Sequence, residues 1–154
     1  MESLAELLTS LHPQQACSLA AVITGAKPTA ILESVEKSHW RALVTLAETE
    51  GLALSYKARS GHVVLWRGRV FVVPNSRLQE PPIDMRSSGA HEGEVPEPLV
   101  SRLGEFAAYV ARDPSTLLEL MRLRETGRRD SETIKRLGEL LGYPECCINN
   151  YVRR

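Results

Sequence analysis

Apolar positions in the first fifty residues recur at the spacing of helices. The run QQACSLAAVIT is apolar on most sides, which predicts a buried helix over 14–24 between Pro13 and Gly25. The run KPTAILESVEK predicts a short helix over 28–37, and SHWRALVTLAETEG predicts a third helix over 38–50 that begins at a serine cap. The inward faces of these last two helices are expected at Ile31, Leu32, Val35, Trp40, Leu43, Val44 and Ala47.

The pattern changes to strict alternation in residues 52–74. The segments LALSYKAR, HVVLWR and RVFVVP are separated by the turn residues SG and by Gly68, and Pro74 ends the last of them. These features predict a three-stranded antiparallel meander.

Residues 75–98 have no periodicity and are rich in proline, glycine, serine and acids. A loop of this length is either functional or a mobile linker, and its composition favours a linker. His91 beside Glu92 is the one hint of chemistry in it.

Helical spacing returns in the last third of the chain. Pro98 is expected to open a helix, Asp113 to cap a second that ends at Gly127, and Asp130 or Ser131 to cap a third. A last short helix is expected from Pro144 onward. The apolar face of the first helix is expected at Leu99, Leu103, Phe106, Ala107 and Val110, and that of the third at Ile134, Leu137, Leu140 and Leu141.

These elements predict an α+β fold with a helical N-terminal part, a three-stranded antiparallel meander, a long loop and C-terminal helices. The boundaries fall at 1–74, 75–98 and 99–154, within one compact domain. Residues 1–74 also fit a winged-helix arrangement, in which 38–50 is the recognition helix and the meander is the wing.

Composition narrows the class of protein. The formal net charge is zero, and no apolar run approaches the roughly 18 residues of a membrane span. The first residues carry acids where a secretory signal carries bases, so we expect a cytoplasmic protein with no membrane partner. Three cysteines, an odd number, favour thiol, redox or metal chemistry over a disulfide framework.

The stretch GYPECC, residues 142–147, is where candidate chemistry concentrates. With Tyr143 as cap and Pro144 as the first helical residue, Cys146 and Cys147 fall in the first helical turn. The helix dipole stabilises a thiolate there, whereas Glu145 opposes it. We therefore expect a modestly activated thiol, with Cys146 the more activated of the two.

The pair leaves several interpretations open. Adjacent helical residues point about 100° apart, so one thiol should face the core and the other a groove or solvent. A direct disulfide between them would close a strained ring. A zinc or iron site would need Cys17 and one of His12, His39, His62 or His91, although Cys17 is itself expected in the core and a chain without any cofactor fits equally well. Burial of both cysteines as core residues also stays open.

The stretch LGYPECCINNY resembles the Gly-Tyr-Pro-x-Cys-Cys signature of a small prokaryotic, mainly archaeal, family of unknown function. ITGAKPTAIL, the strand-rich middle and the leucine-rich helix before the signature are also similar to it. The resemblance implies no established activity. It implies that Gly142, Tyr143, Pro144, Cys146 and Cys147 act together. Relatives are expected to continue the last helix with an aromatic residue, and Tyr151 is the candidate for that place.

A non-enzymatic nucleic-acid-binding module is the main alternative. Basic residues flank the two predicted turns of the meander at Lys57, Arg59, Arg67 and Arg69, and a second basic stretch includes Arg128 and Arg129. RNA, the ribosome and duplex DNA are all candidate partners. Acids interleave with the second stretch, so its pattern favours an ion-paired, solvated helical hairpin over a phosphate-binding patch. A protein that only binds a partner protein is the third interpretation. The sequence leaves open whether the protein is an enzyme, because it contains no familiar acid–base or phosphate-binding motif.

Overall fold

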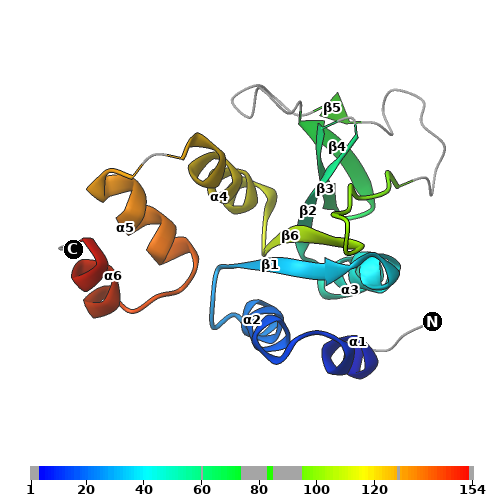
Figure 1. Cartoon of the computed structure of the whole chain (residues 1–154), viewed down its shortest axis with the longest axis horizontal. Helices are drawn as coiled ribbons and strands as arrows, with labels where there is room; N and C mark the ends of the chain where they lie inside the picture. Colours follow the sequence, from blue (N-terminus) through cyan, green and yellow to red (C-terminus); the bar gives the residue numbers. More distant parts are fainter. Residues whose placement is uncertain (1–3, 60, 74–82, 85–94, 128, 153–154) are drawn as a thin grey trace.

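The computed structural model describes residues 4–59, 61–73, 83–84, 95–127 and 129–152. It has an α+β fold built on one antiparallel sheet (Figure 1). The sheet contains β1 (Thr29–Glu36), β2 (Ala53–Ala58), β3 (Gly61–Trp66), β4 (Arg69–Val73), the two-residue β5 (Ile83–Asp84) and β6 (Glu105–Ala111). The strand order is β1-β6-β2-β3-β4-β5. The predicted meander is present as β2, β3 and β4, but it is only the middle of a larger sheet.

The described helices agree with most of the predicted ones. They are α1 (Leu4–Ser10), α2 (Pro13–Thr24), α3 (Trp40–Glu50) after a 3-10 turn (Lys37–His39), α4 (Pro114–Thr126), α5 (Ser131–Leu140) and α6 (Glu145–Val152). Asp113 and Asp130 cap α4 and α5, each accepting a hydrogen bond from a threonine N–H three residues later. The C-terminal helical hairpin is therefore encoded by its caps.

The helix predicted over 28–37 is wrong, because this segment forms strand β1. Ala30 and Leu32 point to the same buried face, as alternation requires. An extra residue then enters β1 between Leu32 and Val35, because these residues pair with Ala108 and Phe106. The bulge returns Val35 to the buried face and produces the spacing that imitates a helix.

The helix predicted from Pro98 is also wrong. Phe106 begins an alternating run in which Ala108 and Val110 share its buried face, and these residues form β6. Leu103, expected on the inward face of a helix, is 82% exposed. The segment before β6 runs along the end of β2, where the Leu99 N–H donates to the Lys57 carbonyl at 2.9 Å.

Two apolar layers cover the two faces of the sheet. On one face, α1, α2 and α3 enclose a core in which Leu19, Leu43 and Tyr56 are almost fully buried. On the other face, α4 packs Leu117 and Met121 against the strands. In Figure 1, α5 and α6 lie beyond α4, away from the sheet.

The position of β6 joins the two halves of the chain. It pairs with β1 on one side and β2 on the other, so residues from the C-terminal part complete the sheet of the N-terminal part. One sheet thus contains strands from both the part expected at 1–74 and the part expected at 99–154. The winged-helix arrangement is also excluded, because the segment expected as its second helix is an edge strand.

Most of residues 75–98, including His91, lie outside the described residues, so the linker prediction stays a prediction. Within the described part of the chain, none of the helices combines the length and the apolar character needed to cross a membrane.

Candidate functional site

Gly142 ends α5 by the left-handed turn that the sequence predicts. It has a φ of 78°, and its N–H donates to the Glu139 carbonyl at 3.1 Å. The Tyr143 N–H donates to the Gly138 carbonyl at 3.0 Å, which completes a Schellman motif. A Cβ at Gly142 would lie 2.9 Å from Cγ of Lys27, so glycine is required here for space as well as for φ.

Cys146 and Cys147 lie in the first turn of α6, as predicted. The Pro144 carbonyl accepts hydrogen bonds from the N–H groups of Cys147 at 3.0 Å and Ile148 at 3.1 Å. Pro144, rather than Tyr143, is therefore the cap. The two cysteines are the second and third residues of the helix.

Both thiols of the pair are exposed and interact with each other. Hydrogen bonding to Cys146 raises the pKa of the Cys147 thiol above its ordinary value, and the negative charge of an ionised Cys146 raises it further. The geometry describes an exposed vicinal dithiol in which the raised pKa of Cys147 keeps its proton on the thiol to a higher pH than in an ordinary cysteine.

The expectation that one of the two cysteines faces the core is wrong. The residue that anchors α6 is Ile148, which is buried against Gly138 of α5. Cys17 was also expected in the core and is instead exposed on α2, where Leu19 and Val22 provide the buried face.

The three cysteines do not assemble into a metal site with other donors. Among the described residues, no group of three or more His, Cys, Asp or Glu side chains is placed to hold a metal ion. In the GYPECC stretch, the candidate ligands for zinc or iron are the two exposed sulfurs of Cys146 and Cys147. Metal binding by the pair therefore stays a prediction that needs donors from elsewhere.

Cys147 lines a groove between α4, α5 and α6, which we call the helical groove. Its volume is about 590 Å³. Its apolar walls are Leu123 from α4, Ile134 and Leu137 from α5, Leu141 just after α5, and Ile148 and Tyr151 from α6. The sequence expects Ile134, Leu137 and Leu141 to be core residues, but they are only partly buried because their side chains border this opening.

Two arginines, Arg124 and Arg129, also line the helical groove. None of its lining residues in the described part of the chain is acidic. Arg124 lies 3.7 Å from Glu33 of β1, at the groove's margin. Arg129 is exposed and has no ion-pair partner among the described residues. The groove is therefore apolar with a positive margin.

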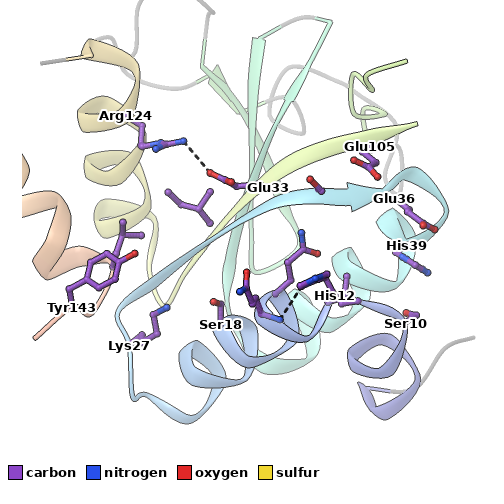
Figure 2. Close-up of a pocket in the computed structure, with 16 residues that line it drawn as sticks. Ser10, His12, Ser18, Lys27, Glu33, Glu36, His39, Glu105, Arg124 and Tyr143 are labelled. Atoms are coloured by element: carbon purple, nitrogen blue, oxygen red, sulfur yellow. Dashed lines mark hydrogen bonds and ion pairs between the residues drawn. The ribbon is translucent and has the colours of Figure 1, made fainter. Parts of the chain in front are cut away.

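A second groove, about 810 Å³ in volume, runs along β1 (Figure 2). Figure 2 shows Glu33 and Glu36 on β1, His12 and Ser18 from the helices below, and Arg124 facing Glu33. The charges in this groove are mixed, and they favour no single class of ligand. It meets the helical groove at Arg124, Leu141 and Tyr143, which line both.

The candidate histidines are dispersed. His12 caps α2 by accepting from the Gln14 N–H at 3.3 Å, and His39 precedes α3. His62 is buried beneath α4 with Nε2 3.6 Å from Glu125. Burial lowers the pKa of His62, and this effect exceeds the opposing attraction of Glu125.

The basic residues of the meander do not form one cluster. Lys57 and Arg59 lie at one end of β3, while Arg67 and Arg69 lie at the other end. Six residues of strand separate these ends by roughly 15–20 Å. The Arg67 guanidinium also stacks 4.7 Å from the ring of Trp66.

Of the second predicted basic cluster, Arg128 lies outside the described residues and Arg129 lines the helical groove. Nucleic-acid binding therefore stays a prediction, because the candidate basic residues that the structure describes do not gather on one surface.

Sequence reasoning located the thiols but missed the groove beside them. At about 100° per residue, Ile134, Leu137, Leu140 and Leu141 share one apolar stripe, which predicts a single buried face. Leu140 is buried, whereas the others border the groove. The sequence therefore carries no signal that separates the groove residues from the core residue of this stripe.

No family model matches this chain, and the searches of curated proteins and of solved structures also find no match.

Proposed function

We propose that Cys146 and Cys147 form a vicinal dithiol that carries out thiol–disulfide exchange with a disulfide substrate. The observation that supports this most is the exposure of both sulfurs together with the raised pKa that Cys146 imposes on Cys147. A structural cysteine pair would be buried, as Ile148 next to it is. The resemblance to the Gly-Tyr-Pro-x-Cys-Cys family is consistent with this role but carries no activity of its own.

The two cysteines have different roles in the proposed reaction. We assign the attack to Cys146, because it lies nearer the N-terminus of α6, whereas hydrogen bonding to Cys146 raises the pKa of the Cys147 thiol. The Cys146 thiolate attacks one sulfur of the substrate disulfide, forming a mixed disulfide and breaking the substrate S–S bond. The leaving thiolate departs and takes up a proton from solvent according to its own pKa. One substrate disulfide and the Cys146 thiolate are thereby converted into one released thiolate or thiol and one mixed disulfide between Cys146 and the other half of the substrate.

The mixed disulfide is resolved by an external thiol rather than by Cys147. A Cys146–Cys147 bond would join residues whose Cα atoms are about 3.8 Å apart, less than a relaxed disulfide requires. The helical backbone at this point is fixed by the two hydrogen bonds to Pro144. A thiol of low molecular weight therefore completes the cycle by attacking the mixed disulfide and releasing Cys146.

The test is the rate at which each cysteine forms a mixed disulfide with a small symmetrical disulfide at neutral pH, followed by peptide mass spectrometry. Cys17 is an exposed reference thiol in the same chain. We expect the peptide that contains the pair to react faster than the peptide that contains Cys17, and the advantage to persist in Cys147→Ser, where Cys146 is the remaining thiol of the pair. Equal rates at the two peptides would contradict the proposal.

A second variant tests how the two cysteines share the proton. Cys146→Ala removes the hydrogen bond and the charge that raise the pKa of Cys147. Cys147 should then ionise at lower pH, and its alkylation at fixed neutral pH should become faster than in the unmodified chain. An unchanged pH profile of Cys147 would show that the two sulfurs do not interact.

A further inference from the structure

We infer that the helical groove is the substrate-binding site of the dithiol, and that its substrate is a small disulfide with an apolar, preferably aromatic, body and an anionic group. This inference rests on the proposed thiol exchange and adds the class of substrate. It is carried by the composition of the groove, by its charge and by the position of Cys147 on its wall.

Most of the apolar side chains that line the groove are only partly covered by the helices around them. Leu123, Ile134 and Leu137 are only partly buried although three helices surround them. Tyr143 and Tyr151, which also line the groove, are 60% and 63% exposed. A flat apolar ligand would pack against these side chains and the exposed aromatic rings, and it would displace water from their apolar surface.

The volume favours a small molecule. About 590 Å³ lies within the range of sites that hold ligands of drug-like size. A nucleic-acid strand would need a positive track along its backbone. Among the lining residues that the structure describes, the positive charge is on Arg124 and Arg129, and most of the others are apolar.

The charge of the groove selects an anion. Arg124 and Arg129 are its charged lining residues, with no acidic side chain among the lining residues that the structure describes. Arg129 has no ion-pair partner within that part of the chain, so its guanidinium is free to bind a carboxylate through two parallel hydrogen bonds. Arg124 already faces Glu33, so Arg129 is the residue that we expect to decide the preference.

Cys147 connects this recognition to the chemistry. It lines the groove, and its neighbour Cys146 is the sulfur that we expect to attack. A substrate with its apolar body between α5 and α6 would have its disulfide near the pair, and the leaving thiolate would form beside the Cys147 proton. Binding and exchange would then take place at adjacent positions.

The test compares four disulfides: dithiobis(nitrobenzoate), which is aromatic and anionic; dithiodipyridine, aromatic and neutral; dithiodiglycolate, aliphatic and anionic; and cystamine, aliphatic and cationic. For each, the rate at the Cys146–Cys147 peptide is divided by the rate at Cys17, which cancels the intrinsic reactivity of the reagent. We expect the largest ratio with dithiobis(nitrobenzoate), and a ratio about tenfold smaller with cystamine, as fits a partly exposed charge-assisted contact. A ratio that does not vary among the four reagents would overturn the inference while leaving the proposed exchange intact.

Matched arginine variants assign the charge effect. Arg129→Gln should remove the preference for anionic disulfides and leave the ratio for neutral dithiodipyridine unchanged. Arg102→Gln changes an exposed arginine in the turn before β6 that does not line the groove, and it should alter neither ratio. The inference is wrong if both variants behave alike.

A binding experiment without thiol chemistry separates failure of the inference from failure of the proposed function. In a Cys146→Ser, Cys147→Ser chain, titration with 2-naphthoate should shift the methyl signals of Ile134, Leu137 and Leu141, and Arg129→Gln should weaken the binding. Shifts combined with thiols that are inert to all four disulfides would retain the anion-binding groove and reject the exchange reaction. Absence of methyl shifts would reject the groove as the site.

Discussion

At the scale of single residues, one buried hydroxyl ties the sheet to the C-terminal helices. Thr29 is fully buried at the start of β1, and its hydroxyl donates to the Leu140 carbonyl at 2.5 Å. Leu140 is the last residue of α5, so this bond fixes the end of the helix that leads into the GYPECC turn. The position of the dithiol therefore depends on a residue far away in the sequence.

Thr29→Val tests this connection. Valine has the shape of threonine but leaves the buried Leu140 carbonyl without its donor, so we expect a loss of about 1–3 kcal/mol in the free energy of unfolding. Urea denaturation measures it, and Thr29→Ser, which keeps the hydroxyl, is the control. A valine variant as stable as the serine variant would show that the hydrogen bond contributes nothing.

At the scale of elements, β3 and α4 enclose a titratable group. His62 is 3% exposed, its Nδ1 has no hydrogen-bond partner within the described ranges, and the charged groups that act on it are Glu125 and Lys57. Its pKa in the folded state is lowered from the ordinary 6.5, chiefly by burial. The unfolded chain therefore binds a proton at His62 more readily than the folded chain does.

Stability should consequently fall in mildly acidic solution. The contribution of neutral His62 is fully present above about pH 6.5 and is lost progressively as the pH falls from there toward the lowered folded-state pKa. We expect the melting temperature of His62→Gln to decline less between pH 7.5 and 5.5 than that of the unmodified chain. His39→Gln, in the turn before α3, is the control and should retain the full decline; equal declines for all three proteins would remove His62 as the cause.

The contact between α5 and α6 gives a second prediction at this scale. A Cβ added at Gly138 would lie 2.7 Å from Cγ1 of Ile148, the residue that anchors α6. Gly138→Ala should displace α6, destabilise the fold by about 1–3 kcal/mol and change the reactivity of Cys146 and Cys147 relative to Cys17. Gly51→Ala provides a contrast, because a Cβ there has open space and only the backbone conformation is strained. If Gly138→Ala leaves the reactivity ratio unchanged, the seating of α6 does not control the dithiol.

The sequence predicts the elements that are defined locally and misses those defined by distant partners. Caps and terminal glycines identify α2, α4 and α5, and alternation with tight turns identifies β2, β3 and β4. Three strands were missed: the two-residue β5, which lies in the expected linker, and β1 and β6, which pair with each other although about seventy residues separate them in the chain. Short apolar runs such as theirs fit a helix or a strand equally well, and only the pairing decides between them.

At the scale of the whole molecule, the candidate site also combines features that local sequence predicts with features that depend on tertiary contacts. The helix start at Pro144 and its two thiols follow from local sequence signals, whereas the exposure of both thiols does not. That exposure depends on Ile148 packing against Gly138, and the groove beside Cys147 depends on how α4 meets α5. Contacts between α4 and α5, such as the paired hydrogen bonds of Arg136 to Glu119 at 2.8 and 2.7 Å, are tertiary and leave no periodic signal.

The whole-molecule arrangement predicts that neither half of the chain folds without the other. Strand β6 lies between β1 and β2, and α4 covers the face of the sheet that bears Val64 and Val73. A fragment of residues 1–98 therefore lacks β6, the strand that joins β1 to the meander. It also lacks α4, so the apolar face that α4 covers would be exposed to water. We expect poor amide dispersion and no cooperative unfolding transition for this fragment. Addition of residues 99–154 should restore both, because the two fragments together supply every pairing of the sheet. A well-dispersed spectrum of residues 1–98 alone would show that the N-terminal part is an independent domain after all.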